Sequence, residues 1–154
     1  MTTPAPQSSP LVFILNGPNL DLLGERQPEL YGHETLQQVK ELCERTAAEL
    51  GLQIDFRQTN SEGTLVDHIH DARTRAQALI INPAAYSHTS VAVHDALHAC
   101  DMPIYEVHIS NTWKRDSFRH TDYVAIAATG QLNGLGVNGY ALALRQVAFV
   151  LQKR

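Results

Sequence analysis

The sequence predicts an α/β protein built on an open sheet of five parallel strands, doubly wound by helices. Three observations support this fold class: five short apolar runs, helix-length segments between them, and turn residues where they join. Several runs are apolar without interruption, which is typical of parallel strands that helices cover on both faces.

The apolar runs are the expected strands. The first, residues 11–15, ends at Asn16-Gly-Pro, a turn-forming sequence that stops a strand. The other four expected strands are residues 54–56, 78–81, 103–109 and 123–127.

The segments between these runs are the expected helices. Residues 35–50 begin with a possible capping box, Thr35 and Gln38, and stop at Gly51. The further expected helices are residues 62–75, 90–100 and 140–152. Strands that alternate with helices require right-handed crossovers, and the simplest arrangement is flavodoxin-like, with strand order 2-1-3-4-5 and helices on both faces.

Length and composition bound the organisation and the partners. The 154 residues suit a single domain over 11–154, preceded by a polar tail, residues 1–10, that we expect to be disordered and that has no features of a signal or anchor. The formal charge of −4 offers no basic face for nucleic acid or a membrane, so the expected partner is a small molecule. The two cysteines, Cys43 and Cys100, are far apart and favour free thiols in the cytoplasm.

Polar residues end three of the expected strands. Asn16 follows the first, Asn82 follows the third, and Glu106 with His108 closes the fourth. Ligands of open α/β sheets bind outside the carboxyl ends of the strands, so these side chains should share one crevice. Glu106 and His108 project from one face of a strand, and a carboxylate beside an imidazole holds it for proton transfer.

The connection after the first strand, residues 17–33, is unusually long and suggests a lid. It contains Arg26 and Tyr31, with glycines at both ends that could act as hinges. A phenol has an ordinary pKa of about 10, so it needs a nearby cation before it can serve as a base at neutral pH.

Two other motifs are interpreted as structural. The segment from Gly134 to Gly139 fits GxGxxG, but no further strand or ribose-binding acid follows, so we predict a close-packed turn and no dinucleotide. His94 and His98 have the spacing of a zinc helix but lack its glutamate and an evident third ligand, so we expect no metal. Neither Lys40, Lys114 nor Lys153 lies at a strand end, which argues against a Schiff base.

Seven ordered blocks resemble the type II 3-dehydroquinate dehydratases, over nearly all of residues 11–151. The blocks are NGPNLDLLG at 16–24, RQPELYG at 26–32, QTNSEG at 58–63, IINP at 80–83, YSHTS at 86–90, EVHISN at 106–111 and FRH at 118–120. The resemblance implies a flavodoxin-like fold, no cofactor or metal, and a homododecamer of four trimers. It also implies reversible anti elimination of water from 3-dehydroquinate through an enolate, giving 3-dehydroshikimate, for aromatic amino acid biosynthesis or quinate catabolism.

The resemblance implies a role for each site residue. Tyr31, aided by Arg26, would be the base; Asn16 would stabilise the enolate, directly or through a bound water; His108, held by Glu106, would be the acid. The residues expected to bind substrate are Asn82, His88, Ile109, Ser110, Arg115, Arg119 and, from a neighbouring subunit, Asp95.

Five positions depart from the family pattern. They are Ala84 in place of Gly, His94 in place of Arg, Trp113 in place of His, and Thr121-Asp122 in place of His-Ser. None is a proton-transfer residue, and we expect Trp113 to serve packing. The alternative that remains open is a flavodoxin-like oligomer that binds a small molecule without catalysis.

Overall fold

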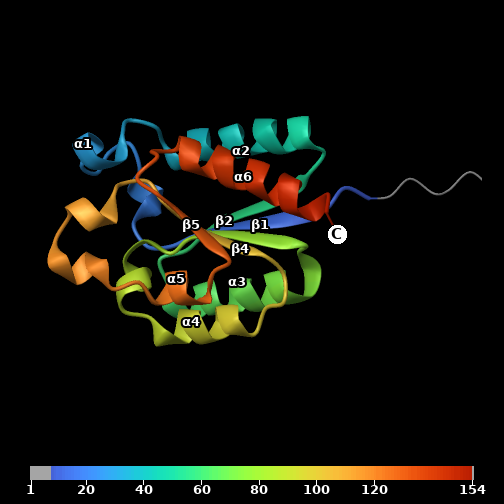
Figure 1. Cartoon of the computed structure of the whole chain (residues 1–154). Helices are drawn as coiled ribbons and strands as arrows, with labels where there is room; N and C mark the ends of the chain where they lie inside the picture. The colour runs from blue at the N-terminus through green and yellow to red at the C-terminus, as the bar shows by residue number, and fades with distance from the viewer. Residues whose placement is uncertain (1–7, 154) are drawn as a thin grey trace, which may run out of the picture.

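The computed structural model describes residues 8–153, so the predicted tail lies largely outside the described residues. Five strands form one sheet, β1 (Leu11–Asn16), β2 (Gln53–Gln58), β3 (Ala78–Asn82), β4 (Ile104–His108) and β5 (Gly130–Asn133). All pairings are parallel and the order is β2-β1-β3-β4-β5 (Figure 1). The predicted fold class and strand order are confirmed.

Helices cover both faces of the sheet. In Figure 1, α2 (Leu36–Leu50) and α6 (Asn138–Leu151) lie on one face, and α3 (Glu62–Arg75), α4 (Val91–His98) and α5 (Tyr123–Ala127) lie on the other. Strand β1 contributes to the core on both faces of the sheet, because Val12 and Ile14 pack under α2 and α6 while Phe13 and Leu15 pack under α3 and α4. This two-sided burial explains the uninterrupted apolar runs.

The predicted helix signals are confirmed at α2. Thr35 and Gln38 form a reciprocal capping box, and Gly51 ends the helix with a left-handed φ of 71°. In the part of the chain that the structure describes, no helix combines the length and apolar character needed to span a bilayer.

The fifth strand was predicted at the wrong residues. Residues 123–127 form the short helix α5, and the edge strand is Gly130–Asn133. The side chain of Asp122 accepts from the amides of Val124 and Ala125, which caps a helix at the start of the apolar run. A five-residue apolar run does not distinguish strand from helix by periodicity, and the true edge strand is too polar to stand out.

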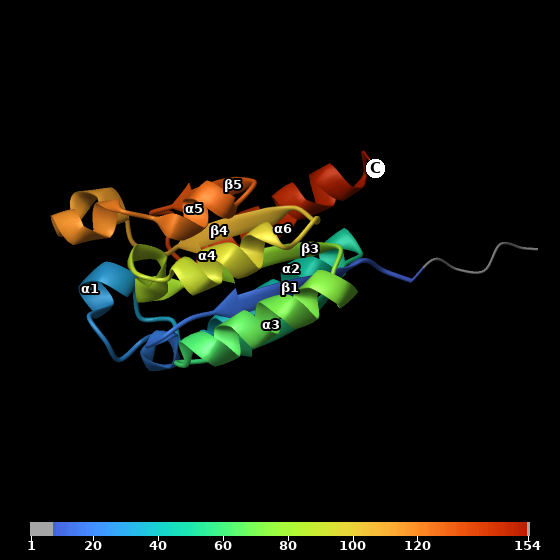
Figure 2. The ribbon, with the colours of Figure 1, turned by 90° about the horizontal axis from the view of Figure 1, so that it is seen from below.

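The connection from β1 to α2 folds over the carboxyl ends of the strands. It contains the 3-10 helix η1 (Leu20–Leu22) and α1 (Pro28–Tyr31). Further short helices, η2 (Ala84–His88), η3 (Thr112–Lys114) and η4 (Ser117–His120), follow β3 and β4. Both views place α1 and the segment of residues 112–120 at the same end of the molecule, away from the C-terminus (Figures 1 and 2).

The glycine segment after β5 is a close turn, as predicted. Gly134 and Gly136 have φ of 81° and 64°, and a Cβ at Gly134 would lie 2.9 Å from Cβ of Asn111. Gly139 lets α6 approach β4, since its Cβ would lie 3.3 Å from Cγ1 of Val107.

Candidate active site

A pocket of about 540 Å³, open to solvent, lies beyond the carboxyl ends of the strands. It is lined by nine of the predicted site residues: Arg26, Tyr31, Asn82, His88, His108, Ile109, Ser110, Arg115 and Arg119. Asn16 and Glu106 lie behind the pocket surface, each with 0% of its area exposed. Asp95 lies exposed on α4 and does not line the pocket.

The pocket has two walls. We use "sheet wall" for the four polar residues that end strands, Asn16, Asn82, Glu106 and His108, and "lid wall" for Arg26, Tyr31 and Arg115, which lie on connections. The sheet wall is buried throughout, whereas each residue of the lid wall is half-buried.

His108 is held by Glu106 as its spacing on the strand predicts. Nε2 of His108 lies 3.0 Å from Oε2 of Glu106, and both side chains are buried. Because the carboxylate engages Nε2, the other ring nitrogen is the one available to the pocket that His108 lines. This arrangement suits a proton donor of fixed orientation.

Two residues that the sequence did not assign to the site join this pair. Oδ2 of Asp122 lies 3.6 Å from Nε2 of His108, and Nε2 of Gln131 donates to Glu106 at 2.5 Å and to Asp122 at 2.8 Å. Glu106, His108 and Asp122 bring ligand-type atoms within 4.8 Å of one another. Because the amide of Gln131 donates into this cluster, we interpret it as a hydrogen-bond network; the expected absence of a metal stays a prediction.

The cluster shifts the pKa of each titratable member. Burial alone would lower the pKa of His108, but Asp122 and Glu106 raise it to about 9. Burial raises the pKa of Glu106 to about 7, against the opposing effect of His108. Burial would also raise the pKa of Asp122, yet its hydrogen-bonding neighbours, chiefly His108, lower it overall. The imidazole is therefore protonated at neutral pH, as a general acid must be.

Asn16 and Asn82 are joined by Tyr140. The Tyr140 hydroxyl donates to Oδ1 of Asn16 at 2.7 Å and accepts from Nδ2 of Asn82 at 2.9 Å. Nδ2 of Asn16 also donates to the carbonyl of Arg57 at 3.0 Å, and Oδ1 of Asn82 accepts from the amide of Ala84 at 3.2 Å. Both amides are thus fixed in orientation, each with a second Nδ2 hydrogen left to donate.

Tyr31, at the end of α1, is held mainly by Arg115. Nη1 of Arg115 donates to the Tyr31 hydroxyl at 2.8 Å and to Oγ of Ser110 at 3.1 Å. Arg26, the predicted helper, lies with Cζ 5.3 Å from the ring centroid of Tyr31. The guanidinium group that contacts the phenol oxygen therefore comes from a residue 84 positions away in the chain, which local spacing could not indicate.

His88 and Arg119 also line the pocket, beside the two walls. Nδ1 of His88 donates to the carbonyl of Thr121 at 2.8 Å, and burial lowers the pKa of this histidine. Nε of Arg119 is buried and makes no hydrogen bond within the described residues, although Oδ2 of the exposed Asp116 lies 3.9 Å away. An unpaired buried donor is costly, so this group suits an oxygen-rich ligand.

The departures from the family pattern fall around the pocket. Ala84 adopts a left-handed φ of 51°, a conformation that glycine adopts without strain. His94 bonds through Nδ1 to the carbonyl of Tyr123 at 2.6 Å, and its ring packs against His98. Trp113 is exposed, 5.3 Å from the ring of His120, and does not line the pocket.

Tyr140 and Gln131 were missed by sequence reasoning. Tyr140 begins an apolar helix pattern, in which an aromatic residue is ordinarily core, and only its hydroxyl gives it a polar role. Gln131 lies on an edge strand whose sequence carries no strong strand signal. Asp122 had one signal, its place among the departures from the family pattern.

Comparisons with known proteins agree with this geometry. The family model for class II dehydroquinases matches residues 10–148. A 3-dehydroquinate dehydratase from Cereibacter sphaeroides is 57% identical over 136 residues, covering 88% of this chain and 92% of the relative. A 3-dehydroquinate dehydratase 2 from Pseudomonas putida is 52% identical over 145 residues, covering 94% of this chain and 97% of the relative. The crystal structure of type II dehydroquinase from Propionibacterium acnes superposes with a TM-score of 0.90 at 42% identity, covering 94% of this chain and 99% of that one.

Proposed function

The chain belongs to the class II dehydroquinase family and is a hydro-lyase acting on 3-dehydroquinate, and from this premise we propose how its pocket performs the reaction. The observation that carries the proposal is that one pocket is lined by Tyr31 from the lid wall and by His108 from the sheet wall. Anti elimination of water next to a ketone is served by a base and an acid on opposite sides of the substrate. Groups from two different walls suit anti elimination.

Tyr31 is the base in this mechanism. Its phenolate takes the proton on the carbon next to the ketone, and the bonding electrons move toward the ketone oxygen to form an enolate. Arg115 supports this role because its guanidinium donates to the phenol oxygen and stabilises the negative charge there. Arg26 adds a second positive charge against the ring.

Asn16 stabilises the enolate through a bound water. It is fully buried and already bonds Tyr140 and the carbonyl of Arg57, so direct contact with substrate is not favoured. Its remaining Nδ2 hydrogen can donate to a water that in turn donates to the enolate oxygen. A fixed donor of this kind stabilises charge as it develops.

His108 is the acid. The enolate electrons expel the hydroxyl on the neighbouring carbon, and the imidazolium gives that hydroxyl a proton so that it leaves as water. Glu106 keeps the ring oriented, and the raised pKa of His108, about 9, supplies the protonated form at neutral pH. The product is 3-dehydroshikimate, an intermediate of the shikimate pathway.

The remaining pocket residues orient the substrate. The amides of Ile109 and Ser110 and the side chain of Asn82 suit its carboxylate, and His88 and Arg119 suit its hydroxyls. The unpaired Nε of Arg119 supports this assignment, since a substrate oxygen would satisfy it.

We also propose a homododecamer of four trimers in the cytoplasm, in which Asp95 reaches the pocket of a neighbouring subunit. Asp95 is exposed on α4, and the exposed apolar side chains Val91, Phe118 and Ile126 suit subunit contacts. Both cysteines are free thiols, in keeping with a reducing compartment. Light scattering of the purified protein measures the assembly directly.

An ultraviolet assay tests the function. Purified protein mixed with 3-dehydroquinate in the presence of a chelator should produce the absorbance of the conjugated enone of 3-dehydroshikimate. Loss of the rise on adding chelator would contradict a metal-free mechanism. A folded oligomer that gives no rise and carries a bound chromophore would instead support the non-catalytic binding alternative.

A further inference from the structure

Asp122 is fixed at two points. Its Oδ1 accepts from the amides of Val124 at 3.0 Å and Ala125 at 2.9 Å, which caps α5. Its Oδ2 accepts from the amide of Gln131 at 2.8 Å and lies 3.6 Å from Nε2 of His108. The carboxylate is therefore held beside the imidazole by one helix end and one strand.

Gln131, on the edge strand β5, joins the two carboxylates beside His108. Its side-chain amide donates to both Glu106 and Asp122, which lets two carboxylates lie close together beside one imidazole. Without such a donor, two neighbouring carboxylates would repel each other in a buried site.

Charged and titratable groups face His108 from several neighbouring elements. From β4 and the turn before α5 come the carboxylates of Glu106 and Asp122. From η2 comes His88, whose ring centroid is 6.4 Å away and whose pKa is lowered by burial. Arg119, Arg115 and Arg26 line the same pocket, with Arg115 committed to Tyr31 and Ser110. Asp122 therefore places a second carboxylate beside His108, in addition to that of Glu106.

We propose that Asp122, held by Gln131, is a positioning residue for His108 that places a carboxylate beside the protonated imidazole and stabilises it. The proposal rests on the role of His108 as the acid of the dehydratase. It assigns a function to the position where the family pattern that this chain resembles has Ser. A serine hydroxyl is neutral and gives the imidazolium no opposite charge, whereas a carboxylate in a buried site favours the charged form.

The pH dependence of kcat tests this role. Below about pH 9 the wild-type His108 carries its proton, and activity that needs the acid is lost as the pH rises through that value. In Asp122→Asn, the alkaline limb of the kcat profile should move down by roughly one pH unit or more, because an opposite charge near a buried group is worth that much. Asn and Ser both cap helices, so Asp122→Asn and Asp122→Ser should keep α5.

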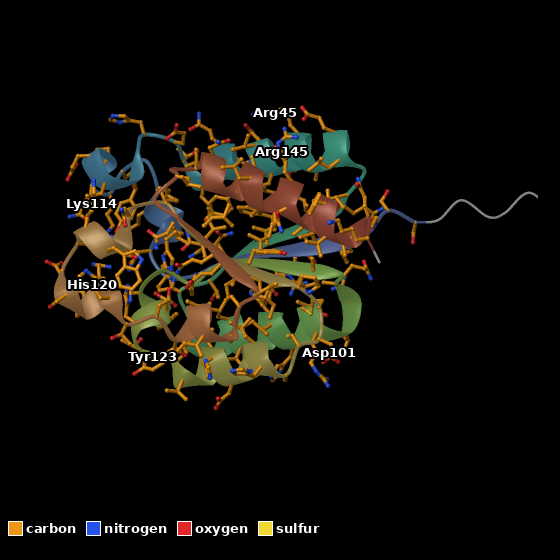
Figure 3. All side chains as sticks on the ribbon, viewed as in Figure 1. Arg45, Asp101, Lys114, His120, Tyr123 and Arg145 are labelled. Carbon is orange, nitrogen blue, oxygen red and sulfur yellow. The ribbon has the colours of Figure 1, made fainter. Side chains whose placement is uncertain are left out.

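The matched control is Asp101→Asn. Asp101 is an exposed carboxylate before β4, and Figure 3 shows it at the opposite end of the molecule from His120. This variant removes the same charge and should leave the alkaline limb unchanged. An equal shift in Asp101→Asn and Asp122→Asn would reduce the effect to net charge and overturn the proposal.

A titration of His108 without substrate separates this inference from the function. With imidazole carbons labelled, and the His108 signal assigned through His108→Asn, NMR should show His108 titrating at higher pH in the wild type than in Asp122→Asn. The same midpoint in both proteins would overturn the role of Asp122 whatever the enzyme assay gives. Absence of turnover in the wild type would contradict the proposed function and leave this titration as the test of the cluster.

Discussion

The sheet wall and the lid wall hold the two residues proposed for proton transfer in opposite ways. His108 ends β4, is only 5% exposed, and is bonded to a neighbour two residues away on the same strand. Tyr31 ends a helix of four residues, is half-buried, and depends on Arg115 from another connection. The proposed acid is therefore oriented by the sheet itself, whereas the proposed base is oriented only when two separate connections meet.

Because the two walls are held differently, substitutions in them should affect stability and activity differently. The buried, hydrogen-bonded groups of the sheet wall contribute to the fold as well as to the site, so changes there should affect both. The lid wall packs less against the core, so changes there should alter turnover while the unfolding transition stays where it is. Variants in each wall test this contrast.

The largest effect is expected for Tyr31→Phe. The change removes the hydroxyl that we propose as the base and keeps the ring against Arg26 and Arg115. General base catalysis contributes about 10²–10⁴-fold, so kcat should fall by that factor with little change in KM or in the unfolding temperature. Steady-state kinetics and thermal unfolding measure both.

Tyr105→Phe is the matched control for the base. The Tyr105 hydroxyl accepts from Gln146 at 3.4 Å, and Tyr105 does not line the pocket. Removing this hydroxyl should therefore leave kcat unchanged. If Tyr31→Phe turned over substrate as fast as the wild type, another group would have to be the base.

The next effect in size is expected for Arg115→Lys. A lysine keeps the charge but cannot reach Tyr31 and Ser110 with one planar group as Arg115 does. Misplacing the base by about 1 Å costs roughly 10²-fold, and kcat should fall by that amount without loss of stability. Arg26→Lys should cost less, because Arg26 contacts the ring and not the hydroxyl.

Arg45→Lys provides the control for this series. Arg45 is exposed on α2, does not line the pocket, and lies away from Lys114 and His120 in Figure 3. It should match the wild type in kcat and unfolding. A larger loss in Arg26→Lys than in Arg115→Lys would restore the sequence-based assignment of Arg26 as the main helper of Tyr31.

The sequence predicted the sheet wall better than the lid wall for a physical reason. Strand ends, side-chain alternation and buried runs are local properties, and they were enough to bring Asn16, Asn82 and the Glu106–His108 pair to one edge. The contact of Arg115 with Tyr31 depends on how two long connections fold back, which no periodicity encodes. The resemblance to the family predicted Arg115 as a site residue but did not predict its contact with Tyr31.

The same limit explains the error at the sheet edge. The polar strand β5 lies beside a short apolar helix, and Asp122 selects the helix by capping it. The side chain of Asp122 also lies beside His108 and accepts from Gln131 on β5. Because residues 123–127 were predicted as the strand, neither β5 nor the role of Asp122 in connecting β5 with the site was predicted.

The smallest effect, and the sharpest test of the sheet wall, is expected for Gly17→Ala. A Cβ at Gly17 would lie 2.4 Å from the carbonyl oxygen of Pro83, where the chains leaving β1 and β3 meet, and Gly17 donates its amide to the Asn82 carbonyl at 2.8 Å. Relieving that overlap moves Asn16 and Asn82 apart and costs about 1–3 kcal/mol of stability. Gly63→Ala is the control, because its Cβ would meet nothing closer than 4.0 Å and the change should stabilise by about 0.4–1 kcal/mol. Urea unfolding at one protein concentration, together with kcat, should show stability and turnover falling together in Gly17→Ala. A loss of turnover at unchanged stability would mean that the sheet wall, like the lid wall, can be disturbed without disturbing the fold.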